Sequence, residues 1–326
     1  MQKNETQIYF LFYLNLKYCI IIIKQLLRRS IDMQTIHYFN ITYNCDSNCK
    51  FCAANVGIIN RFNCNITPKE FEAKLSSSNV KVGDRIIING GEPSLSPYFW
   101  GILEICKKYK CIIDLYTNGH FLSIESNVKK LLSFTPLIIR IPIFGFEIEH
   151  DELTGNIGNY KKVISALEYL YKYSNPSKFK VNVKFLLCKA TVKQNHLLFN
   201  SLFNKYGNFF EYTLNPLLVS KKVIENADTL FLSYMELIKL SKDFITIPEI
   251  NCDLIPLCLL PIKKRYQILN NKNYNVIKKY NDKNNSSSSL NDFNRKSCDS
   301  CSLKNYCSKF PDTYIDYFGE GEITPL

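Results

Sequence analysis

The sequence predicts an α/β protein: a partial (β/α)6 barrel followed by a small C-terminal cysteine-rich cap. Six short, apolar, β-rich segments alternate with helical patterns between residues 33 and 245. Such alternation is typical of repeated right-handed βα units. From residue 246 onward the alternation stops, and several cysteines gather at short spacings. In a barrel of this kind we expect the functional site at the carboxyl ends of the strands.

The six expected strands have the near-continuous apolar character of buried parallel strands. They cover residues 36–43, 85–89, 111–116, 137–143, 181–187 and 212–218. The first helix begins at Thr67-Pro68, where Thr67 is the N-cap and Pro68 takes the first helical position. The later helices are expected over residues 97–109, 123–132, 160–171, 192–206 and 232–244.

Composition excludes a disordered chain and a secreted disulfide scaffold. The 326 residues are 46% hydrophobic and 21% charged, which is ordinary for a globular protein. The 13 cysteines are odd in number and clustered, so thiolate metal ligands in a reducing, cytoplasmic compartment explain them better than disulfides. The net charge of +12 fits an acidic partner such as a peptide or nucleic acid. Because no single basic helix or arm dominates, we favour the interpretation as a soluble lysine-rich surface over a specific acidic partner.

Three regions are expected along the chain. Residues 1–32 are assigned to an extension outside the fold, because Asn15 and Lys17 interrupt an apolar stretch that is short for a membrane span of ~20 residues. An amphipathic anchor is the alternative for this extension. Residues 33–245 form the barrel and residues 246–326 the cap. Asn, Lys and Ser dominate near residues 270–291, which predicts a flexible loop inside the cap.

The first cysteine cluster comes directly after the first strand. Cys45, Cys49 and Cys52 follow a C-x3-C-x2-C spacing, so one loop can present three thiolates. A [4Fe–4S] cluster usually has four cysteine ligands. With three, the fourth iron stays open to a substrate or cofactor. A structural zinc site with a remote fourth ligand is the alternative, but zinc sites usually combine paired C-x2-C halves.

A second motif, Gly90-Gly91-Glu92-Pro93, follows the second strand. Glycines let the backbone approach a ligand closely, and a carboxylate suits an ammonium group. Together with the cysteine spacing, this motif resembles the radical S-adenosylmethionine (radical SAM) superfamily. The resemblance implies that these four residues hold the amino group of the methionine part of S-adenosylmethionine, which would bind at the open iron.

Other segments extend the resemblance. Phe51 is the aromatic residue that the family places before its third cysteine, and Asn118 lies in a TNG strand end near the cofactor, although it could instead only shape the turn. Pro142 stands where many relatives have a serine that touches the cofactor ribose, which leaves that contact in doubt. His150 and Asp151 either act in catalysis or order their loop, so no catalytic residue is assigned.

The implied activity is reductive cleavage of S-adenosylmethionine to a 5′-deoxyadenosyl radical that abstracts hydrogen from a substrate. The tail from residue 307 to 319 resembles that of the His-Xaa-Ser-type maturases, so the expected substrate is a ribosomally made precursor peptide. The expected electron donor is a protein such as flavodoxin or ferredoxin. Two alternatives stay open: a radical enzyme acting on a small molecule or RNA, and a non-enzymatic iron–sulfur or zinc protein. The GGEP motif argues against the latter, because an electron carrier has no use for a methionine-binding segment.

The second cysteine cluster lies in the cap. Cys298, Cys301 and Cys307 need a fourth thiolate, and Cys258 is preferred to Cys252 because its setting resembles the auxiliary-cluster segment of relatives. Four thiolates would close an auxiliary [4Fe–4S] cluster without an open iron. Structural zinc is the alternative, because C-x2-C also suits that ion.

Overall fold

The architecture is a curved parallel sheet with helices on its outer side, as expected from the sequence. The computed structural model describes residues 35–52, 65–173, 175–271, 276–280, 298–304, 306–308 and 310–326. Its eight strands lie in the order β7-β6-β5-β4-β3-β2-β1-β8, and every neighbouring pair is parallel. The six expected strands are the central ones: β1 (Thr35–Thr42), β2 (Arg85–Gly90), β3 (Ile112–Tyr116), β4 (Leu137–Ile143), β5 (Phe179–Leu187) and β6 (Glu211–Pro216).

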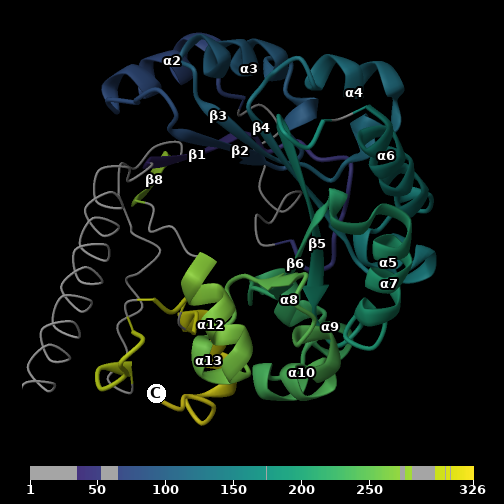
Figure 1. Cartoon of the computed structure of the whole chain (residues 1–326), viewed down its shortest axis with the longest axis vertical. Helices are drawn as coiled ribbons and strands as arrows, with labels where there is room; N and C mark the ends of the chain where they lie inside the picture. The colour runs from purple at the N-terminus through teal and green to yellow at the C-terminus, as the bar shows by residue number, and fades with distance from the viewer. Residues whose placement is uncertain are drawn as a thin grey trace, which may run out of the picture.

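The helices cover the convex side of the sheet (Figure 1). The expected helices are α2 (Pro68–Ser77), α3 (Phe99–Lys108), α4 (Glu125–Leu131), α6 (Asn159–Tyr173), α7 (Asn195–Tyr206), and the pair α10 (Tyr234–Leu240) and α11 (Lys242–Ile245). Helix α2 begins as predicted: Thr67 and Glu70 form a reciprocal capping box, and Pro68 takes the first helical position. Shorter helices that the sequence did not indicate are α5 (Glu147–Thr154), α8 (Lys221–Glu225) and α9 (Ala227–Leu230).

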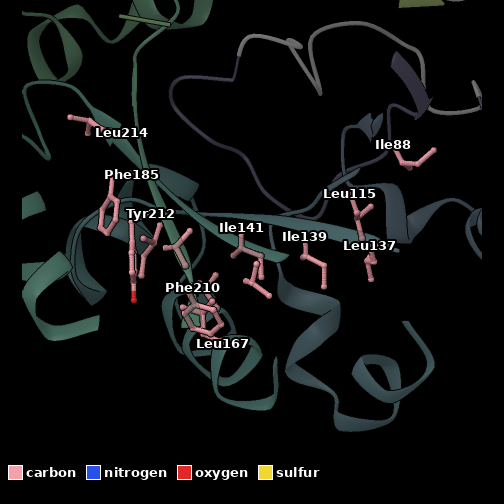
Figure 2. Packing of buried hydrophobic residues seen from close by; sticks show 14 of the residues in the cluster. Ile88, Leu115, Leu137, Ile139, Ile141, Leu167, Phe185, Phe210, Tyr212 and Leu214 are labelled. Carbon is pink, nitrogen blue, oxygen red and sulfur yellow. The ribbon is translucent and has the colours of Figure 1, made fainter. Parts of the chain in front are cut away.

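The two faces of the sheet differ in chemistry. Apolar side chains such as Leu115, Ile139 and Ile141 point from the strands toward the helices, where Leu167 of α6 joins the same buried cluster (Figure 2). The alternate residues point to the concave side, where they line two hollows: Arg140 and Asn182 are examples, on β4 and β5. The period-2 alternation of a strand thus separates a dry packing face from a polar interior.

Two edge strands complete the sheet. β7 (Ile250–Cys252) pairs with β6, and β8 (Val276–Tyr280) pairs with β1. β8 lies within the region 270–291, where the sequence predicts a flexible loop, and its backbone pairs with the edge that β1 presents. Residues 272–275 and 281–297 of this region lie outside the described residues, as does the expected N-terminal extension 1–32.

The C-terminal segment packs on the end of the barrel. It includes α12 (Ile262–Asn271) and α13 (Asp312–Phe318), which Figure 1 shows beside α10. The Tyr314 ring stacks on Tyr234 at a centroid distance of 4.1 Å, and the Tyr234 backbone N–H donates to the Tyr314 hydroxyl at 2.7 Å. These contacts fix α13 against α10. Within the described ranges, no helix has the length and apolar character needed to cross a membrane.

Core packing should dominate the stability of this fold. Ile139 is 0% exposed in the central strand β4, whereas Ile157 is 98% exposed. We expect Ile139→Ala to lower the free energy of unfolding by about 2–5 kcal/mol, through lost burial and the cavity left behind. The same substitution at Ile157 is the control and should leave it nearly unchanged. Urea unfolding followed by circular dichroism measures both, and equal losses would contradict the assigned core.

Candidate functional site

A cavity of about 420 Å³ opens at the carboxyl ends of the central strands. Its wall contains Cys45, Cys49 and Cys52, so the structure brings the three predicted thiols to one place. Gly90 and Gly91 also line it, from the end of β2. The carboxyl-end location matches the position that the barrel topology predicts for a site.

The cysteine loop is fixed on one side by the end of β2. The Gly91 N–H donates to the Thr42 carbonyl at 2.9 Å, and the Glu92 N–H donates to the Asn44 carbonyl at 2.7 Å. A Cβ at Gly90 would lie 2.2 Å from the Thr42 oxygen, and one at Gly91 would lie 2.3 Å from the Asn44 oxygen. The two glycines are therefore required by this backbone contact, and the close approach of a ligand that the sequence predicts for them remains a prediction.

The other side of the loop rests on the C-terminal end of α5. The Asn48 N–H donates to the Thr154 carbonyl and the Lys50 N–H to the Leu153 carbonyl, both at 2.9 Å. Gly155, which ends α5 with φ +79, would place a Cβ 2.9 Å from the Asn48 oxygen. Sequence reasoning missed this contact. The pair Thr154-Gly155 could have indicated the end of this helix, because a glycine after a helix favours a left-handed C-cap.

The three thiols are close enough to affect one another. Burial raises the pKa of Cys45 to about 11 and that of Cys49 to about 12. Cys52 contributes to both shifts, because a second thiolate nearby disfavours ionisation. Ligation of a cation would reverse this preference and release the thiol protons. Among the described residues, no three His, Cys, Asp or Glu side chains converge on a point suited to a single metal ion. Three thiols bordering a cavity fit a larger cationic group such as a cluster.

Glu92 lies behind the cavity wall. It is 1% exposed, and its carboxylate accepts the Ser94 N–H at 3.1 Å, the Thr117 hydroxyl at 2.9 Å and the Asn118 N–H at 2.8 Å. Burial is the main influence on its pKa and raises it, while these donors oppose the rise. Glu92 therefore joins the end of β2 to the end of β3. Pro93, also buried, begins the 3-10 turn η1 (Pro93–Leu95) behind the same wall.

Phe51 and Asn118 both line the cavity. The Phe51 ring packs edge-on against Phe144 at 4.5 Å, which anchors the third cysteine's neighbour to the end of β4. The Asn118 amide donates to Asp46 at 2.6 Å, inside the cysteine loop. Asn118 therefore ties the loop to β3 while it remains part of the cavity wall.

His150 and Asp151 lie on α5 and have different surroundings. Asp151 accepts the backbone N–H groups of Gly158 and Tyr160 at 2.5 and 2.7 Å, so it orders the turn into α6. The Phe144 N–H donates to His150 Nδ1 at 3.1 Å, which places the ring proton on Nε2. Burial lowers the pKa of His150 to about 4, so the ring is neutral near pH 7. Both His150 and Pro142 line the cavity.

The cysteines of the C-terminal region also lie close together. Cys258, Cys298, Cys301 and Cys307 line a small cavity of about 20 Å³. The Leu257 N–H donates to Cys307 Sγ at 3.2 Å, so the two cysteine-bearing segments are in direct contact. Cys252 is not in this group: it lies on β7, is 4% exposed and borders the hollow at the opposite end of the barrel.

The central region of the chain is similar to known proteins. Residues 39–186 match the family model of the radical SAM superfamily. The match covers slightly less than half of the 326 residues and supports the resemblance to this superfamily. A protein of Methanocaldococcus jannaschii, described as a proposed activating enzyme for a glycyl-radical enzyme, is 28% identical over 148 residues. These residues are 45% of this chain and 54% of that protein. The chain thus spans about half the length of this curated relative.

Solved structures share the fold. SuiB of Streptococcus suis bound to S-adenosylmethionine has a TM-score of 0.52 at 17% identity, over 74% of this chain and 55% of SuiB. SuiB bound to its precursor peptide SuiA has a TM-score of 0.51 at 18% identity, over 72% and 51% of the two chains. The protein anSMEcpe with bound S-adenosylmethionine has a TM-score of 0.51 at 18% identity, over 65% and 60%. At these identities the likeness shows a shared fold alone.

The carboxylate of Glu92 should be a major support of the site. Glu92→Gln keeps the shape but turns one acceptor into a donor facing hydroxyl and N–H donors. We expect it to lower the free energy of unfolding by about 1.5–3 kcal/mol, the scale of hydrogen bonds to a charged group. Glu104→Gln, at an exposed position on α3, is the matched control. Urea unfolding of both variants provides the measurement; equal stabilities would mean that the Glu92 contacts contribute nothing.

Proposed function

We propose that the chain is a radical SAM enzyme whose Cys45, Cys49 and Cys52 hold a [4Fe–4S] cluster and whose cavity binds S-adenosylmethionine. The observation that carries this proposal is that these three thiols and the Gly90-Gly91 backbone line one cavity at the carboxyl ends of the strands. When bound, the two groups supply one-electron cleavage of S-adenosylmethionine and removal of a hydrogen atom from the substrate.

The chain's own residues position these groups and exclude water. Gly90, Gly91 and Asn118 face the cavity and would contact the cofactor with backbone and amide groups. Glu92 acts from behind, by fixing the ends of β2 and β3. Phe51, Phe144 and other apolar side chains keep the cysteine side of the cavity dry, which favours radical chemistry over side reactions with solvent.

For the substrate, we propose a ribosomally made peptide, with flavodoxin or ferredoxin as the class of electron donor. The structural likeness to SuiB, which was solved with a precursor peptide, supports this choice. The cavity is open to the outside through the ends of the strands, as access for a side chain of a polypeptide requires. The resemblance of the tail to maturases of the His-Xaa-Ser type points in the same direction.

We further propose that Cys258, Cys298, Cys301 and Cys307 hold an auxiliary [4Fe–4S] cluster. All four line one small cavity, although 40 residues separate Cys258 from Cys298 in the sequence. Such a cluster would join the segment after β7 to the C-terminal tail. A structural zinc ion is the competing occupant, because four thiolates also satisfy zinc.

Cleavage of S-adenosylmethionine should depend on the first three cysteines. The reconstituted, reduced protein should release 5′-deoxyadenosine, and the variant Cys45→Ala/Cys49→Ala/Cys52→Ala should release none, because no ligand for the open-iron cluster remains. Cys106→Ala, a buried cysteine of α3, is the control and should keep the activity. Liquid chromatography of anaerobic reactions measures the product. Sustained release by the triple variant would reject the proposed mechanism.

Iron content should separate the two cysteine sites. The reconstituted parent should contain roughly eight irons from two four-iron clusters, and the triple variant roughly four. Cys258→Ala should lose the second set, whereas Cys252→Ala, the matched control, should keep both. Iron and zinc analysis with electron paramagnetic resonance provides the measurement. Four irons and one zinc in the parent would instead identify a zinc cap.

A further inference from the structure

The concave side of the sheet carries a cluster of charged groups that the proposed chemistry does not use. Arg140 of β4 forms a bidentate ion pair with Asp114 of β3, with Nε–Oδ1 and Nη2–Oδ2 distances of 2.6 and 2.9 Å. Arg85 Nη1 lies 3.7 Å from the same carboxylate. Two guanidinium groups thus lie beside one carboxylate.

Lys184 of β5 adds another cation, and it faces the cavity. It forms no ion pair or hydrogen bond with any residue that the structure describes. Its ammonium group lies 5.0 Å from the centroid of the Tyr116 ring. A half-buried ammonium group is normally paired with an anion, so a lysine without an ion pair at a cavity wall can accept an anionic group of a ligand.

Asn215 provides a second, independent indication. It lies on β6 and lines the same cavity, and its Oδ1 is buried without a hydrogen-bond partner among the described residues. Lys184 pairs with Thr213 of β6, and Asn215 is the next residue on that face. The amide can present either its oxygen or its NH2 group at this position, since the two are interchangeable by rotation. An ammonium and an amide on adjacent strands form a recognition pair for a carboxylate.

We propose that Lys184 and Asn215 bind a carboxylate side chain of the substrate, such as that of a glutamate in a peptide. The inference rests on the proposed function in taking this cavity as the substrate cavity. The cysteine loop and the GGE segment follow β1 and β2. Lys184 and Asn215 lie on β5 and β6, and β3 and β4 separate these two strands from β1 and β2 in the sheet. Lys184 is also three residues before the end of β5, deeper in the barrel than the strand ends.

Several charged groups face Lys184, and they set its titration. Burial, followed by the nearby Arg140, lowers the pKa of Lys184 to about 8, while Asp253 and Asp114 oppose the shift. The pKa of the Tyr116 hydroxyl is raised to about 12 by burial, so it stays neutral. In the free protein the ammonium is therefore lost as pH rises through about 8. Carboxylate binding should weaken over the same range.

The test uses the reconstituted full-length protein with S-adenosylmethionine bound. Calorimetric titration compares N-acetyl-glutamate methylamide with N-acetyl-glutamine methylamide, which has the same shape without the charge. The parent should prefer the acid at pH 7 by roughly tenfold or more, the scale of one charge-assisted hydrogen bond. This preference should fall between pH 7 and 9. Lys184→Met should abolish it, and Lys184→Arg should retain it at both pH values, because arginine stays charged.

Lys180→Met is the matched control. Lys180 lies on the same face of β5 but borders the other hollow, where its ammonium is 3.4 Å from Glu211. This variant should keep the parental preference. If the parent binds both probes equally, or neither, the proposal is overturned. It is also overturned if Lys184→Met keeps the preference, or if this variant loses affinity for S-adenosylmethionine alone, which would assign the lysine to the cofactor's carboxylate. Because probe binding needs no turnover, failure of S-adenosylmethionine cleavage in the parent would refute the proposed function separately.

Discussion

The site depends on one constraint: the backbone of the cysteine loop must lie in direct contact with two other backbone segments. On one side it accepts N–H groups from Gly91 and Glu92, and on the other it donates to the carbonyls of Leu153 and Thr154. A side chain at Gly91 or Gly155 would collide with loop carbonyls. Because main-chain groups hold the loop on both sides, the three thiols are positioned with little dependence on flexible side chains, as a rigid metal-binding site requires.

The strands supply the second level of organisation. Their alternation separates an apolar outer face, which packs under the helices, from a polar concave face around Arg140 and Lys184. The outer face provides the burial that stabilises the barrel, and this frees the concave face to carry charges. A buried carboxylate such as that of Asp114 is tolerated there because two guanidinium groups lie beside it. The cavity can be lined by charged side chains because the apolar core lies on the other face of the sheet.

The two cysteine sets reflect different ways of building a site. Cys45, Cys49 and Cys52 lie on one short loop, so their spacing alone shows that they can act together. The cap set needs Cys258, which the chain brings to Cys307 only after β8 and a long intervening segment. For the first set, the spacing of the cysteines in the sequence is enough to predict the site. In the second, the aromatic packing of Tyr314 on Tyr234 fixes the tail close enough for the thiols to meet.

The sequence by itself determined the six βα units, the capping box of α2, the three-thiol loop and the GGEP turn, because each depends on neighbouring residues and periodicity. Only the tertiary structure decided that Glu92 lies behind the cavity wall, that Gly155 contacts the cysteine loop, and that Val276–Tyr280 pairs with β1. It also decided that Lys184 faces the cavity beside the Tyr116 ring, without an ion pair or hydrogen bond to any described residue. Burial and pairing are set by groups distant in the chain, and no local pattern of a single sequence records which of them will meet.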